Sequence, residues 1–107
     1  MTLDEYQKQA LTTAKDKDVE LMHRALGLAA EAGEVSGKLN KWLRDTKGDL
    51  SKLDKKDLAS EMGDTLWFLA TLADHLGYSL DKIAKENLEK LADRNRRDVI
   101  HGAGDNR

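Results

Sequence analysis

The sequence has 107 residues, about the length of one domain, with a formal net charge of -2 and no cysteine. The lack of cysteine excludes disulfides and thiolate metal sites, and the near-neutral charge argues against broad electrostatic binding of nucleic acid. Hydrophobic residues make up 39% and charged residues 36%, with no proline and few β-branched aliphatic residues. This composition is typical of a soluble helical protein.

No segment has the character of a membrane span or a signal peptide. The longest apolar run, 66–73, is interrupted by Thr71 and is far shorter than the roughly 20 residues of a transmembrane helix. The N-terminal segment is charged from Asp4 onward and has no apolar stretch of the signal-peptide kind. We therefore expect a cytoplasmic protein with no membrane partner.

The first two predicted helices are separated by a polar interruption. Thr2 and Glu5 have the spacing of a capping box, which predicts a first helix over about 3–15. The polar stretch 16–18 follows, and a long second helix is predicted over about 19–44. Its apolar residues recur at the three- and four-residue steps of an α-helix.

Two further helices are predicted after a loop at 46–53. Asp54 is a good cap for the third helix, and Gly77 is a good C-terminal stop for it. Ser79 has the side chain of an N-cap for the fourth helix. The predicted ranges are 54–76 for the third helix, 80–96 for the fourth and 98–107 for an irregular tail.

Four helices with short connections predict an all-α fold, a four-helix bundle that forms a single domain over 1–107. The second and third helices carry apolar residues on more than one face, and a monomer rarely exposes such patches. A chain this short also buries only a modest fraction of its surface. We therefore expect a homo-oligomer, either a homodimer or a homotetramer, closed by a two-fold interface.

Four carboxylates are predicted to meet between the second and third helices. Glu31 and Glu34 are three residues apart, as are Glu61 and Asp64, so each pair lies on one face of its helix. If the two helices run antiparallel, the pairs face each other and offer hard oxygen ligands, which suit Mg²⁺ or Mn²⁺ and not zinc. The alternative is that these acids only face water, as most helical acids do.

The third helix favours the metal site over that alternative. Phe68 and Leu72 share a helical stripe with Glu61 and Asp64, which predicts that the stripe faces the core. Two unit charges about 4 Å apart repel by roughly 4 kcal/mol at an effective dielectric constant of 20. A cluster of inward-facing carboxylates therefore needs protons or a cation. We expect the cation to be Mg²⁺, for which Mn²⁺ can substitute.

Polar and basic side chains suited to phosphate lie on the second and fourth helices. Asn87, Lys90 and Arg94 recur at steps of three and four along the fourth helix. Arginine also suits bidentate contact with phosphate. Lys38 and Lys41 continue the acidic stripe of the second helix. For the fourth helix the alternative is a solvated end whose cations interact favourably with the helix dipole.

Three further residues have a structural and a functional interpretation. Trp42 and Trp67 are predicted to be core residues, with stacking on a nucleotide base as the alternative. His23 follows Glu20 by three residues, which matches half of a di-iron ligand set. That set requires two such motifs, so we expect a structural histidine.

The stretches GLAAEAGEVSGKLNKWLRD and ASEMGDTLWFLATLADHLG resemble the MazG-type nucleotide pyrophosphohydrolases. The signature of that family is E-x-x-E, a variable spacer and E-x-x-D, matched here by Glu31 and Glu34, then 26 residues, then Glu61 and Asp64. A K-x-x-x-R element on the last helix of the family is matched by Lys90 and Arg94.

The resemblance implies a four-helix Mg²⁺ enzyme in which the four carboxylates hold the metal. The implied reaction is attack of water on the α-phosphate of a (deoxy)nucleoside triphosphate, which gives the monophosphate and pyrophosphate. Three other functions stay open: a hydrolase of the same superfamily acting on phosphoribosyl-ATP or dUTP, a carboxylate-bridged di-iron bundle, and a non-catalytic helical interaction module.

Overall fold

The computed structural model describes residues 1–15 and 20–107, and the regular structure of these residues is entirely helical. The elements in chain order are α1 (Leu3–Leu11), α2 (Glu20–Thr46), the short 3₁₀ helix η1 (Leu50–Lys52), α3 (Lys55–His75) and α4 (Leu80–Arg96). The prediction of four α-helices in an all-α fold is confirmed. Among these described helices, none has the length and apolar character needed to cross a bilayer.

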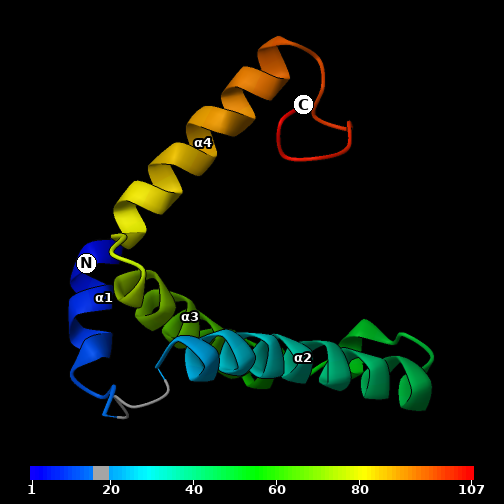
Figure 1. Ribbon diagram of the computed structural model, residues 1–107. Helices are drawn as coiled ribbons and strands as arrows, with labels where there is room; N and C mark the ends of the chain where they lie inside the picture. Colours follow the sequence, from blue (N-terminus) through cyan, green and yellow to red (C-terminus); the bar gives the residue numbers. More distant parts are fainter. Residues whose placement is uncertain (16–19) are drawn as a thin grey trace.

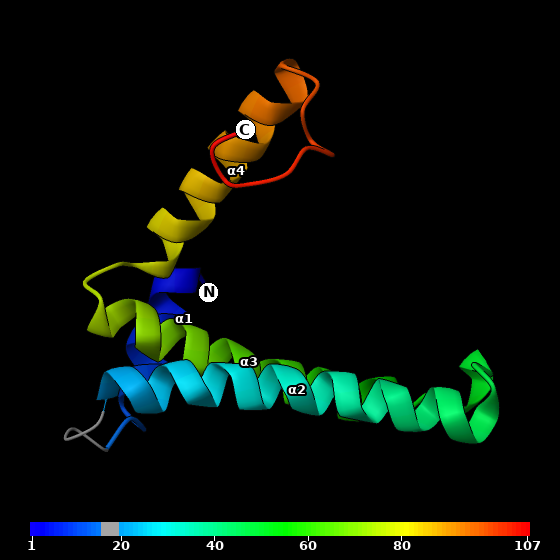
Figure 2. The same cartoon turned by 45° about the vertical axis from the view of Figure 1, so that its right-hand side comes forward.

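An antiparallel hairpin of α2 and α3 forms the framework of the molecule (Figure 1). η1 lies in the turn at one end of the hairpin, and α1 packs against α3 at the other end. α4 makes its main contact with α1 and then extends away from the hairpin in both views (Figure 2). One chain is therefore an open arrangement of four helices and not a closed four-helix bundle.

The first helix begins as predicted and ends earlier than predicted. Thr2 and Glu5 form the capping box, with each side chain accepting the other's backbone N–H at 3.0 Å. The helix ends at Leu11, where the N–H groups of Thr13 and Ala14 donate to carbonyls three residues before them, both at 3.1 Å, instead of four residues before them. The hydroxyls of Thr12 and Thr13 donate to carbonyls of the same last turn at 2.7 and 2.8 Å. These bonds satisfy carbonyls that a longer helix would otherwise pair. The predicted end at residue 15 is wrong for this reason.

α2 extends two residues beyond its predicted end at Arg44, a difference of the size expected at helix ends. The predicted polar interruption at 16–18 and the predicted start at residue 19 lie outside the described residues. In the turn that follows, Lys47 and Gly48 adopt positive φ angles of 56° and 81°. The indole N–H of Trp42 donates to the carbonyl of Asp49 at 2.8 Å and ties the turn to the end of α2.

The predicted ends of α3 and α4 are confirmed by their capping bonds. The side chains of Asp54 and Ser79 accept backbone N–H groups of the first turns of α3 and α4 at 2.9 and 3.1 Å. α3 ends in a Schellman motif, with Gly77 at φ 82° and the N–H groups of Gly77 and Tyr78 donating to carbonyls of the last turn at 2.9 and 2.8 Å.

The buried core is small and lies where α1, α3 and the start of α4 meet. It consists of Ala10, Ala70, Ala73 and Leu80, with Tyr6, Trp67 and Ile83 packed against it. Trp67 is half-buried against this core, which agrees with the core role predicted for it, and its indole N–H donates to Thr13 Oγ1 at 2.8 Å.

Gln7 of α1 joins three segments inside this core. Its Nε2 donates to the carbonyls of Ala70 and Tyr78, both at 3.0 Å, and its Oε1 accepts the N–H of Leu80 at 3.2 Å. The side chain is buried, so its amide is shielded from water and these bonds replace hydration. Gln7 thereby ties the start of α4 to α1 and to α3.

Gly27 marks a close approach of α2 to α3. A methyl group at this position lies 2.2 Å from Cε1 of the Phe68 ring, so Gly27→Ala is expected to destabilise the fold by about 1–3 kcal/mol through overpacking. Gly37 on the same helix has open space around it, and Gly37→Ala is expected to stabilise by about 0.5–1 kcal/mol. Urea unfolding followed by circular dichroism measures both changes, and equal effects of the two substitutions contradict the expectation.

Candidate metal centre

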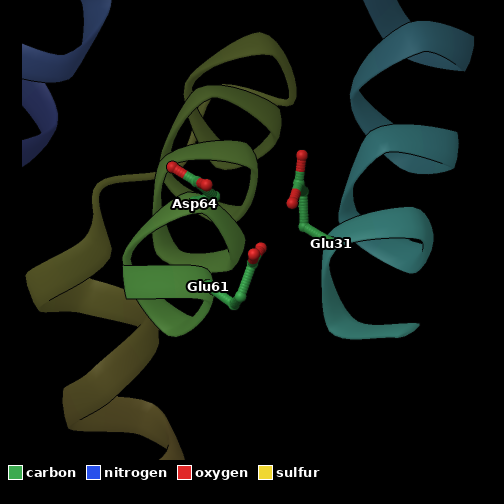
Figure 3. A group of neighbouring side chains, drawn as sticks. All are labelled: Glu31, Glu61 and Asp64. Carbon is green, nitrogen blue, oxygen red and sulfur yellow. The ribbon is translucent and has the colours of Figure 1, made fainter. Parts of the chain in front are cut away.

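The hairpin of α2 and α3 brings three of the four predicted carboxylates together (Figure 3). Glu31 comes from α2, and Glu61 and Asp64 come from successive positions on one face of α3. One carboxylate oxygen of each residue lies within 4.8 Å of the other two. Glu31 and Glu61 are half-buried, while Asp64 is exposed. The group is therefore open to solvent on the side of Asp64.

Glu34 is exposed and lies outside this group of three. Its charge nevertheless acts on Glu31, whose pKa is raised by desolvation, by the charges of Asp64 and Glu61, and to a smaller extent by the charge of Glu34. The structure thus keeps Glu34 near the site without placing its oxygens beside those of the other three carboxylates.

The electrostatics of the group favour a bound cation. Desolvation, followed by the charges of Asp64 and Glu61, raises the pKa of Glu31 above its ordinary value. A cation bound among the carboxylates would relieve the repulsive part of this shift. Their donor atoms are all carboxylate oxygens, the ligands that Mg²⁺ and Mn²⁺ prefer. The residues present therefore fit a magnesium or manganese ion.

Lys38 of α2 contributes a positive charge that contacts this group. Its Nζ lies 2.6 Å from Asp57 Oδ2 and 2.7 Å from Glu61 Oε1. Hydrogen bonds to the two carboxylates raise the pKa of Lys38, so it stays charged. Asp57 was not among the residues that the motif spacing selected. The sequence feature that could have identified Asp57 is its position four residues before Glu61, which puts both side chains on one helical face.

A groove of about 220 Å³ lies beside Lys38, between the end of α2 and the start of α3. Lys41 and Lys52 contribute two further positive charges to its lining, and Trp42 contributes an aromatic ring. The described part of the lining is Lys38, Lys41, Trp42, Lys52, Leu53, Asp54, Asp57 and Leu58. A phosphate chain bound to a metal requires acidic side chains for the metal and positively charged side chains beside them for the phosphate oxygens.

The predicted phosphate ligands of α4 bind a carboxylate of the C-terminal tail. Lys90 Nζ lies 2.7 Å from Asp105 Oδ1, and the guanidinium of Arg94 donates to the same oxygen at 3.0 Å. These contacts hold the pKa of Asp105 below its ordinary value. Asn87 lines a pocket of about 530 Å³ together with Lys90 and Asp105. The tail is irregular as predicted, but it folds back on α4.

The basic stripe of α4 is not beside the acidic group within one chain. α4 packs mainly against α1, and the half of α4 that carries Lys90 and Arg94 points away from α2 and α3 (Figures 1 and 2). The sequence placed both sets of residues on the correct helices. It gave no information on the direction of α4.

His23 packs edge-on against Phe68, with ring centroids 5.8 Å apart. In the part of the chain that the structure describes, the group able to hold a metal contains no histidine. The contact agrees with the structural role that the sequence predicts for His23. The side chain of Glu20, the other member of the Glu-x-x-His motif, lies outside the described part.

The described part of the chain is helical and carries E-x-x-E and E-x-x-D on an antiparallel hairpin. The sequence matches the family model described as the MazG nucleotide pyrophosphohydrolase domain over residues 21–98. The chain belongs to this family. It is also similar to the gene 37 protein of Mycobacterium phage L5, with 40% identity over 114 aligned positions that cover the whole of both chains. No solved structure gives a significant match.

Proposed function

We propose that this protein is a cytoplasmic, Mg²⁺-dependent nucleoside triphosphate pyrophosphohydrolase that converts a (d)NTP into the (d)NMP and pyrophosphate. The observation that carries the proposal is the convergence of Glu31, Glu61 and Asp64 across the hairpin, in a chain of the MazG family. The raised pKa of Glu31 adds a physical reason for a cation at this place.

The carboxylates and lysines of the hairpin have separate roles in this proposal. A bound Mg²⁺ supplies charge neutralisation for the phosphate chain and acidifies the attacking water. Glu31, Glu61 and Asp64 hold the ion, and Glu34 is the fourth carboxylate of the site because its charge acts on Glu31. Lys41 is proposed to bind phosphate oxygens, and its position in the lining of the groove beside Lys38 supports this role.

Lys90 and Arg94 are proposed to bind the substrate's phosphates, with Asn87 beside them. Their contact with the Asp105 carboxylate supports this role, since it is a contact with an oxyanion. Because α4 extends away from the hairpin of its own chain, we propose that these residues act at the acidic group of a second copy. The working unit in this proposal is a homodimer or homotetramer.

The position of cleavage tests the proposed reaction directly. The standard (d)NTPs and dUTP are the substrates, and the reaction is run in ¹⁸O-labelled water. Early products are separated by ion exchange, and mass spectrometry shows which product carries the label. Attack of water on the α-phosphate predicts equal amounts of pyrophosphate and monophosphate, with the label in the monophosphate. Diphosphate with orthophosphate, or label in the pyrophosphate, contradicts the proposal.

A further inference from the structure

Lys38 forms ion pairs with two carboxylates of α3. Its Nζ lies 2.6 Å from Asp57 Oδ2 and 2.7 Å from Glu61 Oε1, distances of charge-assisted hydrogen bonds. The side chains of Lys38 and Glu61 are 29% and 19% exposed, so both partners are partly shielded from water. Salt screens such a contact less than it screens a fully exposed pair.

The contact restricts one of the carboxylates of the candidate metal centre. Lys38 takes Oε1 of Glu61 and leaves the second oxygen of that carboxylate for another partner. Hydrogen bonds to a ligating carboxylate fix its orientation, and their loss weakens metal binding. The ammonium also reduces the repulsion of Glu61 with the other two acids of the group.

We propose that Lys38 is a positioning residue, which holds Glu61 in the orientation that binds the metal, and that Asp57 anchors Lys38. Asp57 is itself fixed at the start of α3, where its N–H donates to the side chain of the helix cap Asp54 at 2.9 Å. A carboxylate in the first turn is also favoured by the helix dipole. This inference rests on the proposed function, because it requires the acidic group to bind a divalent cation.

Two other roles of Lys38 predict different effects on metal affinity. A lysine that only binds phosphate leaves the affinity for the metal alone unchanged. A lysine that competes with the metal for Glu61 lowers that affinity, so its removal makes metal binding tighter. A positioning lysine raises the affinity, so its removal makes metal binding weaker. The sign of the change, measured without nucleotide, therefore separates the three roles.

The experiment is calorimetric titration of Mn²⁺ into the full chain without nucleotide. Lys38→Met is expected to weaken Mn²⁺ binding by about 10- to 100-fold, the effect of losing a group that orients a ligand. Asp57→Asn is expected to weaken it less, and Lys38→Arg to recover part of the affinity. The control is Lys56→Met, which removes the same charge from an exposed position in the first turn of α3 and is expected to leave the affinity unchanged.

Unchanged or tighter Mn²⁺ binding by Lys38→Met overturns the inference while the proposed function stands, provided the wild-type protein binds Mn²⁺. A wild-type protein that binds no Mn²⁺ overturns both. Thermal unfolding in EDTA shows whether each variant is folded before titration. If Lys38→Met does not fold, Asp57→Asn decides the matter, because it retains the lysine and removes only its anchor.

Discussion

Replacing Glu61 with glutamine is expected to lower kcat for triphosphate hydrolysis by at least about a hundredfold. The substitution preserves the size of the side chain and removes the charge at the point where the acidic group meets Lys38. A catalytic metal contributes several kcal/mol, and each 1.36 kcal/mol corresponds to about a tenfold change in rate. A coupled assay of pyrophosphate release measures the loss, and circular dichroism shows whether the helices are intact.

The matched control for this substitution is Glu89→Gln on α4. Glu89 is exposed, and its ion pair with Lys85, at 3.9 Å, is a surface contact of small energetic value. The same change of charge is therefore expected to leave the activity close to that of the wild type. A well-folded Glu61→Gln protein with wild-type turnover removes Glu61 from the proposed chemistry.

Helix ends were the most predictable part of the fold, because they depend on chemistry within a few residues. The side chains of Asp54 and Ser79 bond to N–H groups only three residues away, and Gly77 supplies the positive φ that ends α3. The exception is the end of α1. There Thr12 and Thr13 bond back to the helix, an option that the hydrophobic spacing does not reveal.

The acidic group was also predictable, since the three-residue spacing puts Glu61 and Asp64 on one face of a helix. An antiparallel hairpin was the single assumption needed to bring Glu31 to them, and the structure contains that hairpin. The assumption did not bring Glu34 into the group, because its carboxylate does not lie beside the oxygens of the other three acids. Spacing on a helix fixes which side chains share a face, but it does not fix which of them reach the same point in space.

Contacts between distant segments were the part that sequence patterns did not show. Gln7 reads as an ordinary polar residue of a surface helix, yet it is buried and bonds to groups more than 60 residues away along the chain. The contact of Asp105 with Lys90 and Arg94 is of the same kind, because it depends on the path of the tail. The periodicity of α4 itself reveals neither contact, because it describes only which side chains share a face of that helix.

The surface of a single chain is larger than a compact monomer of this size exposes. Its accessible area is 7978 Å², whereas a compact 12.0 kDa protein exposes about 6,000 Å². Its radius of gyration is 16.9 Å, against about 13 Å for a compact domain of this length. The excess of about 2,000 Å² per chain is in the range that obligate dimers bury. Leu26 on α2 and Leu88 on α4 are 64% and 67% exposed and contribute to it.

Light scattering at micromolar concentration is therefore expected to give a mass of at least twice the 12.0 kDa of one chain. Leu69→Asp places a charge in an open apolar groove of about 550 Å³ that α2 and α3 line together. Burying that charge in an interface costs about 3 kcal/mol or more, so association is expected to weaken by at least about a hundredfold. Leu69 is 38% exposed in one chain, so the fold of the chain itself is expected to tolerate the change.

Leu50→Asp is the control, because Leu50 is 69% exposed in η1 and lies outside the lining of that groove. It is expected to keep both the mass and the activity of the wild type. If Lys90 and Arg94 act on the acidic group of a second copy, the Leu69→Asp protein is expected to lose activity as dilution dissociates it and its measured molecular mass falls. A wild-type mass near 12 kDa with full activity refutes the oligomer. It also refutes the role of Lys90 and Arg94 at the site of a second copy, because the two sets of residues lie apart within one chain.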